Sequence, residues 1–217
     1  MELVQDICYD GDAQALREKV GAYGVDAVHN AFYNGLSCLY QASQFNADPS
    51  LVWYLLVNGA DPNAVGHGRW GTALVGASHH GMLPIMDILM AYGANASIFH
   101  SNALRESFSG AYDFQRKVAK KLLENGADPN AADPDSDDES MRRSPFMNAV
   151  FWARLGLVRE MAKWMDNVPN IEVDDVSDAI LRRRTSRRKF LELINEEIEL
   201  GRRERQVSLG KLRVSNR

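Results

Sequence analysis

A five-residue phrase, GADPN, occurs at residues 59–63 and again at residues 126–130, and a related phrase, GANAS, lies between them at residues 93–97. The leading glycines, Gly59, Gly93 and Gly126, are 34 and 33 residues apart. Each follows an apolar segment of helical character, and a glycine with positive φ commonly ends a helix at such a place. A period of this length indicates small helical units that stack and bury their apolar faces on one another.

A second landmark precedes each helical segment. The stretches LSCLYQA, GTALVGA, SNALRES and RSPFMNA align so that good helix N-cap residues share one position: Ser37, Thr72, Asn102 and Ser144. In the last stretch a proline follows, which suits the first turn of a helix because its missing N–H would be unpaired there anyway. We therefore expect a helix to begin directly after each of these four residues.

Cap, apolar anchor and terminating glycine together resemble the ankyrin-repeat family, with its G-x-T-P-L-H-x-A and LL-x-x-G-A-D-x-N motifs. The nearest match is residues 72–95, TALVGASHHGMLPIMDILMAYGAN. The resemblance covers residues 1–165 and implies an all-α ankyrin-repeat solenoid with short hairpin loops and capping helix pairs at both ends. The family's histidine after the leucine is replaced, so packing is expected to hold more of the register; the residues at that position are Tyr40, Val75, Arg105 and Met147.

The repeats are predicted at about residues 35–64, 70–97, 101–130 and 143–166, after an N-terminal capping pair at residues 2–24. The third repeat is about three residues longer than the second, near residues 109–115. Residues 131–143 are acidic and poor in apolar side chains, which predicts a mobile loop. A C-terminal capping helix pair is predicted at residues 170–201, followed by a basic tail at residues 202–217.

Composition restricts the compartment and the class of partner. The net charge of −4 argues against a general nucleic-acid binder, and no run of apolar residues is long enough to cross a membrane. The two cysteines, Cys8 and Cys38, make no disulfide framework and are predicted to be packed thiols in a reducing compartment. We expect a cytoplasmic or nuclear monomer. Phosphate-loop and paired-cysteine motifs are absent, so we expect neither a cofactor nor a metal ion.

The resemblance implies that the protein binds another protein, as an adaptor or inhibitor, through the groove lined by the first helices and the hairpin tips. Aromatic and arginine side chains dominate protein interfaces. The candidate partner-binding residues on this ground are Arg69, Trp70, His79, Phe99, Tyr112 and Trp152. For each aromatic residue, packing between repeats is the alternative interpretation.

An alternative function is a small-molecule site or an unusual enzyme in the same groove. Its candidate polar groups are His79, His80, His100 and Tyr112. Neither a cysteine nor an H-x-x-x-H pair accompanies these histidines, so no metal site is predicted.

A basic run, RRRTSRRK at residues 182–189, allows three interpretations. It is a solvated charged face, a nuclear-import or anion-binding patch, or a phosphorylation switch at Thr185 or Ser186. The run lacks interleaved aromatic residues, which argues against single-stranded nucleic-acid binding.

Overall fold

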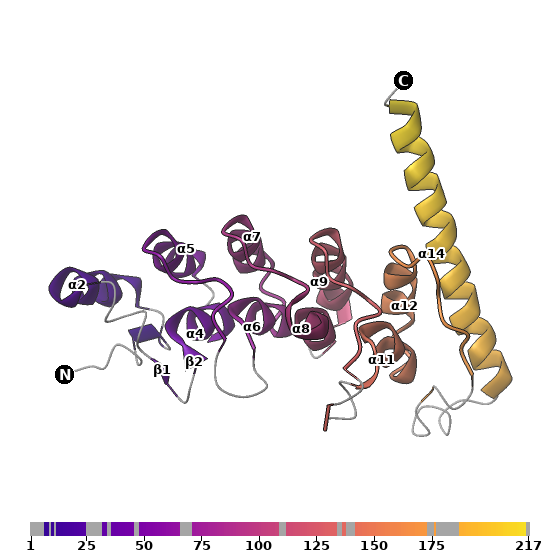
Figure 1. The fold of residues 1–217 in the computed structure, drawn as a ribbon, viewed down its shortest axis with the longest axis horizontal. Helices are drawn as coiled ribbons and strands as arrows, with labels where there is room; N and C mark the ends of the chain where they lie inside the picture. The colour runs from indigo at the N-terminus through magenta and orange to yellow at the C-terminus, as the bar shows by residue number, and fades with distance from the viewer. Residues whose placement is uncertain are drawn as a thin grey trace. The chain divides into compact units, whose positions relative to one another are not determined.

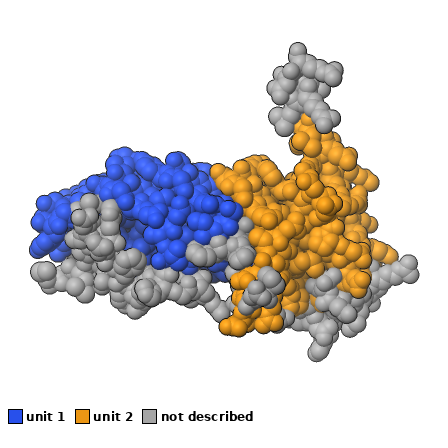
Figure 2. All heavy atoms as spheres, viewed as in Figure 1, with its two compact units in different colours: residues 1–114 blue, residues 115–217 orange. Residues whose placement is uncertain are grey.

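The computed structural model describes residues 7–8, 10, 12–24, 32–33, 36–45, 48–65, 71–108, 112–133, 136–137, 142–172, 176 and 187–215. Backbone contacts divide the chain into two compact units, unit 1 at residues 1–114 and unit 2 at residues 115–217 (Figure 2). Within the described part, every element is a helix except one pair of two-residue strands, which confirms the predicted all-α class. None of the described helices is long and apolar enough to span a membrane.

Unit 1 consists of short helices in two rows (Figure 1). Helices α4, α6 and α8 pack side by side, and we call them the inner helices. Helices α5 and α7 form the outer row: they pack on each other, α5 also packs on α4, and α7 also packs on α6. Strands β1 and β2 pair antiparallel, with Phe32 opposite Ser37. The elements are α2 (Ala13–Tyr23), β1 (Phe32–Tyr33), β2 (Leu36–Ser37), α4 (Cys38–Phe45), α5 (Pro49–Val57), α6 (Ala73–His79), α7 (Leu83–Ala91) and α8 (Ile98–Glu106).

The predicted helix starts are correct in three of four repeats. The Oγ of Ser37 accepts a hydrogen bond from the N–H of Tyr40 at 3.1 Å, and α6 begins directly after Thr72. In the third repeat the prediction is wrong, because α8 begins at Ile98 and Asn102 is a buried residue inside it. A glycine with positive φ, Gly71, precedes α6, whereas no glycine or proline lies between residues 96 and 102 to delay the helix start.

The predicted helix ends are confirmed. Gly59, Gly93 and Gly126 have φ values of 90°, 91° and 90°, in the left-handed region. After α7 the N–H of Ala94 donates to the carbonyl of Leu89 at 2.9 Å, which satisfies a carbonyl that the helix leaves open. The glycine thus turns the chain and closes the helix end at the same point.

Packing and one asparagine side chain join neighbouring repeats in unit 1. The aligned leucines Leu39, Leu74 and Leu104 are all buried, as the repeat pattern predicts. Beyond the core, Asn63 donates from Nδ2 to the carbonyl of Gly93 at 2.9 Å, and its Oδ1 accepts from the N–H of Asn95 at 2.8 Å. These bonds hold the end of one repeat against the end of the next.

The two cysteines differ from the prediction. Cys8 and Cys38 are joined in a disulfide, with their Cα atoms 5.3 Å apart, so the prediction of two reduced thiols is wrong for this structure. Cys38 is the first residue of α4, and both cysteines are buried. The reason is tertiary: folding brings a residue 30 positions upstream against the start of α4.

Unit 2 contains most of α9 (Tyr112–Glu124), α11 (Pro145–Phe151), α12 (Leu155–Ala162) and α14 (Arg187–Ser215). Helix α11 begins as predicted, because the Oγ of Ser144 accepts from the N–H of Met147 at 3.2 Å. Helix α9 has 13 residues, against 9 in α7, and this length absorbs the extra residues of the third repeat. In the segment predicted to be a mobile acidic loop, Arg142 Nε donates to the carbonyl of Ser136 at 2.8 Å, while residues 134–135 and 138–141 lie outside the described part.

Helix α14 is longer than the second helix of the predicted capping pair. It spans 29 residues, so residues 202–215, predicted as a tail, form its second half. Arg, Glu, Gln, Leu and Lys, which predominate there, are good helix formers. The first helix of that pair was predicted in a region where residues 177–186 lie outside the described part.

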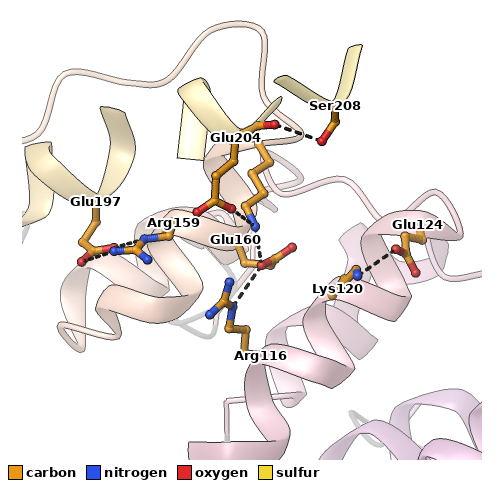
Figure 3. A network of polar contacts seen from close by, with 9 residues as sticks. Arg116, Lys120, Glu124, Arg159, Glu160, Glu197, Glu204 and Ser208 are labelled. Carbon is orange, nitrogen blue, oxygen red and sulfur yellow. Dashed lines mark hydrogen bonds and ion pairs between the residues drawn. The ribbon is translucent and has the colours of Figure 1, made fainter. Parts of the chain in front are cut away.

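Ion pairs hold α14 on α12 (Figure 3). Glu160 of α12, only 3% exposed, accepts from Arg116 Nε at 3.1 Å and from Lys163 Nζ at 2.9 Å. The same Lys163 lies 2.5 Å from Glu204 of α14, and its hydrogen bond to that carboxylate lowers the pKa of Glu204. Because Glu160 is buried, these two cations compensate a charge that would be costly to bury without a partner.

Candidate functional site

The C-terminal ends of the inner helices bring several polar side chains together in unit 1. His79 is the last residue of α6 and Glu106 the last residue of α8. His79 Nδ1 lies 3.2 Å from Glu106 Oε2, and these side chains are 35% and 34% exposed. The pair therefore joins two successive repeats while part of each side chain remains accessible to a binding partner.

A second histidine extends this surface. His80 is the C-cap residue of α6 and is exposed, and its ring meets that of His79 edge-on at a centroid distance of 4.9 Å. Partial desolvation, followed by the neighbouring charge of His79, lowers the pKa of His80. Both effects favour the neutral imidazole, in which one nitrogen donates and one accepts hydrogen bonds.

Tyr40 is a buried residue that packs beneath this surface. It is 2% exposed, and its ring packs against Gly76, where an added Cβ would lie 3.4 Å from Cε2 of the tyrosine and 3.3 Å from Cβ of Gln44. Burial and then the charge of Glu106 raise the pKa of Tyr40 to about 12, so its phenol stays protonated. The absence of a side chain at Gly76 therefore makes space for the tyrosine ring. Gln44, on α4, remains partly exposed.

An exposed aromatic residue lies at the turn that follows His80. Gly81 has a φ of 68°, and an added Cβ there would lie 3.2 Å from Cβ of Phe114, whose side chain is 49% exposed. Together Gln44, His79, His80, Glu106 and Phe114 form what we call the inner-helix cluster. It combines hydrogen-bonding groups, one carboxylate and one aromatic ring on the surface of three stacked repeats.

The sequence-predicted candidates are only partly brought together. His79 and His80 are adjacent in the inner-helix cluster. Phe99 and His100, which precede the predicted helix start at Asn102, lie in the first turn of α8. Tyr112 is the first residue of α9, and the side chains of all three residues are outside the described part. The small-molecule alternative therefore stays a prediction. Among the described residues, no group of three His, Cys, Asp or Glu side chains is placed to hold a metal ion.

Other candidates lie elsewhere. Arg69, Trp70, Thr185 and Ser186 fall outside the described residues. Trp152, at the end of α11 in unit 2, is 51% exposed, and its ring meets Phe151 edge-on at 5.1 Å. The guanidinium of Arg143 lies 4.0 Å from the centre of the Phe151 ring and makes a cation–π contact beside the exposed tryptophan.

The aligned repeats predict Gln44 and Glu106 as exposed positions on the first helices, although neither is among the candidate partner-binding residues. Both side chains are partly exposed in the structure, and stacking of the helices brings Glu106 to His79. Phe114 belongs to the extra residues of the third repeat, so no aligned repeat indicated its position.

Comparison with known proteins bears on the repeats and the fold. Residues 39–133 match a family model described as ankyrin repeats, in three copies. The search of curated proteins gave no match. Among solved structures, the human ASB11 ankyrin repeat domain has a TM-score of 0.64 and 19% identity, over 91% of this chain and 84% of that one. The ankyrin repeat domain of Bcl-3, a member of the IkappaB family, has a TM-score of 0.64 and 21% identity, over 93% and 86%.

Proposed function

This chain carries ankyrin repeats over residues 39–133 and has the fold of ankyrin-repeat domains, and from this we propose that it binds a partner protein as an adaptor or inhibitor. Ankyrin-repeat domains generally mediate protein–protein interaction. We place the binding face on the inner-helix cluster and on the hairpin tip that the sequence predicts at Arg69 and Trp70. Fold alone does not determine function, so the proposal depends on the chemistry of this surface.

The observation that carries the proposal is the inner-helix cluster itself. Its side chains come from α4, α6, the turn after α6, α8 and α9, and they are exposed or partly exposed. The hydrophobic core is formed by other, apolar residues of the same helices, so the side chains of the cluster do not contribute to it. A surface with an exposed aromatic ring and several adaptable polar groups is typical of protein interfaces.

The charge of unit 1 indicates the kind of partner. Residues 1–114 contain 4 Lys and Arg and 11 Asp and Glu, which gives 4 − 11 = −7. A negative surface attracts a partner with a basic face and raises its association rate, and added salt weakens this attraction. We therefore propose that the partner presents basic side chains toward Glu106.

The test is partner capture by a variant with His79→Ala, His80→Ala and Phe114→Ala. We expect its affinity for the captured partner to fall at least tenfold, about 1.4 kcal/mol. A second variant, Arg69→Ala with Trp70→Ala, is expected to weaken binding to a similar degree. Isothermal titration calorimetry with the identified partner gives both numbers.

The matched control is Trp53→Ala. Trp53 is also an exposed aromatic residue, 47% accessible, but it lies on α5 in the outer row. We expect this variant to bind normally. If Trp53→Ala abolishes binding while the cluster variant binds like the wild type, the outer helices form the interface. A further variant with Arg182, Arg183 and Arg184 changed to Ala tests the basic run, whose effect should diminish as salt is raised.

A further inference from the structure

Helix α14 presents an exposed face opposite the side that packs on α12. Ile194 and Ile198 are buried, as is Gly201, whose backbone approaches that of α12. On the other side Glu196, Leu200, Arg203 and Val207 follow one another at intervals of four, three and four residues, so they form a single stripe along the helix. All four are exposed, and the two apolar residues are 38% and 58% accessible.

The charges along α14 are ordered. Residues 192–199 contain four Glu and no Lys or Arg, whereas residues 202–213 contain five Lys and Arg and one Glu. The first of these segments is thus acidic and the second is basic. A second α14 running antiparallel would place basic residues against acidic ones on both sides, while a parallel one would place like charges together.

We propose that α14 pairs antiparallel with the α14 of a second copy of this chain, along the stripe from Glu196 to Val207. Leu200 of each copy then packs on the aliphatic stem of the other copy's Arg203, whose guanidinium reaches toward Glu196 and Glu199. The same surface serves both copies, as a two-fold axis requires. On this proposal the chain forms a dimer, where the sequence predicts a monomer. The surface belongs to unit 2, whereas the inner-helix cluster belongs to unit 1.

The stripe is short, with two apolar residues in each copy, so the dimer is weak. An interface of this kind belongs to the small, transient class, and a dissociation constant on the order of 10 μM is expected. The charged residues contribute mainly to orientation and choice of partner. Dimerisation should therefore be visible at tens of micromolar and should weaken with salt.

Sedimentation equilibrium of the full chain from 1 to 200 μM tests the proposal, with two charge variants. Arg203→Glu makes both charged residues of the stripe acidic. Glu196→Lys with Glu199→Lys leaves only basic residues at positions 196, 199 and 203. Each variant alone is expected to dimerise at least tenfold more weakly than the wild type. Mixed in equal amounts, the two should form a heterodimer at least as tight as the wild-type dimer, because their stripes carry opposite charge.

The control is Lys120→Glu, which reverses an exposed charge on α9 in the same unit, and far-UV circular dichroism confirms that every variant is folded. The control should dimerise like the wild type. A wild type that stays monomeric up to 200 μM overturns the proposal. A dimer that Arg203→Glu leaves unchanged, or variants that fail to associate on mixing, also overturn it.

Discussion

Two residues with positive φ show how backbone conformation limits the choice of side chain. Gly93 ends α7 with a φ of 91°, and a Cβ added there meets no atom within 4 Å, so only backbone strain opposes a larger residue. Ala153 has a φ of 55° and is the one non-glycine residue with positive φ among the described residues. It lies in the turn between α11 and α12. Gly81 occupies the corresponding position in the turn between α6 and α7.

We expect Gly93→Ala and Ala153→Gly to change stability in opposite directions. The left-handed conformation costs a residue with a Cβ about 1–2 kcal/mol. Gly93→Ala should therefore lower the free energy of unfolding by about 1 kcal/mol. Ala153→Gly should raise it by roughly half that amount, because glycine also loses more entropy on folding. Urea unfolding followed by circular dichroism measures both changes.

Gly21→Ala is the control for these two variants. Gly21 lies within α2 without positive φ, and a Cβ there meets nothing within 4 Å, so alanine should stabilise the helix. If Gly93→Ala has the same sign as this control, the left-handed conformation at residue 93 is not maintained in solution.

At the scale of elements, α12 and α14 are held together by close approach of their backbones. A Cβ at residue 201 would overlap the carbonyl oxygen of Arg159 and lie 3.0 Å from Cβ of Ala162. Beside this contact, Arg159 Nη2 donates to Glu197 Oε1 at 2.9 Å, and Arg205 Nη1 donates to the carbonyl of Met165 at 2.8 Å. The polar contacts therefore depend on a glycine that lets the helices approach.

Gly201→Ala is expected to loosen α14 from α12. Overpacking against a backbone atom cannot be relieved by rotating a side chain, and it costs about 1–3 kcal/mol. Hydrogen exchange monitored by mass spectrometry should show faster exchange in residues 190–205. Gly156→Ala is the matched control, because its Cβ meets nothing within 4 Å in α12. Equal exchange in both variants would mean that α14 does not approach α12 this closely.

At the scale of the whole molecule, the Cys8–Cys38 disulfide acts on the unfolded chain. It closes a segment with a sequence separation of 30 residues, and this restricts the unfolded chain more than the folded one. We expect reduction to lower the free energy of unfolding by roughly 3–4 kcal/mol. Thermal melts with and without dithiothreitol measure the effect.

The control for the disulfide is a variant with Cys8→Ala and Cys38→Ala. It should melt near the reduced wild type and be insensitive to dithiothreitol. A thiol titration of the purified, unreduced protein should find no free cysteine. Two titratable thiols in that sample would show that the predicted reduced pair is the state in solution.

The repeat architecture could be predicted from sequence because its signals are local. Gly93 reports a positive φ, Leu74 an apolar anchor and Pro145 a helix start, and each depends on a few neighbouring residues. The period then follows from the spacing of these signals along the chain. The start of α8 was missed because Ser97 and Asn102 are both acceptable caps, and a local rule does not choose between them.

The candidate site and the contacts that join elements were decided by the tertiary structure. His79 and Glu106 are 27 residues apart, Cys8 and Cys38 are 30 apart, and Arg116 and Glu160 are 44 apart. No local pattern marks such pairs, since each depends on how two helices stack and on which positions then face each other. The sequence by itself determined the repeats and their order along the chain, because backbone preferences act within a few residues. Only the tertiary structure decided which side chains meet, because distances between elements follow from the packing of the whole core.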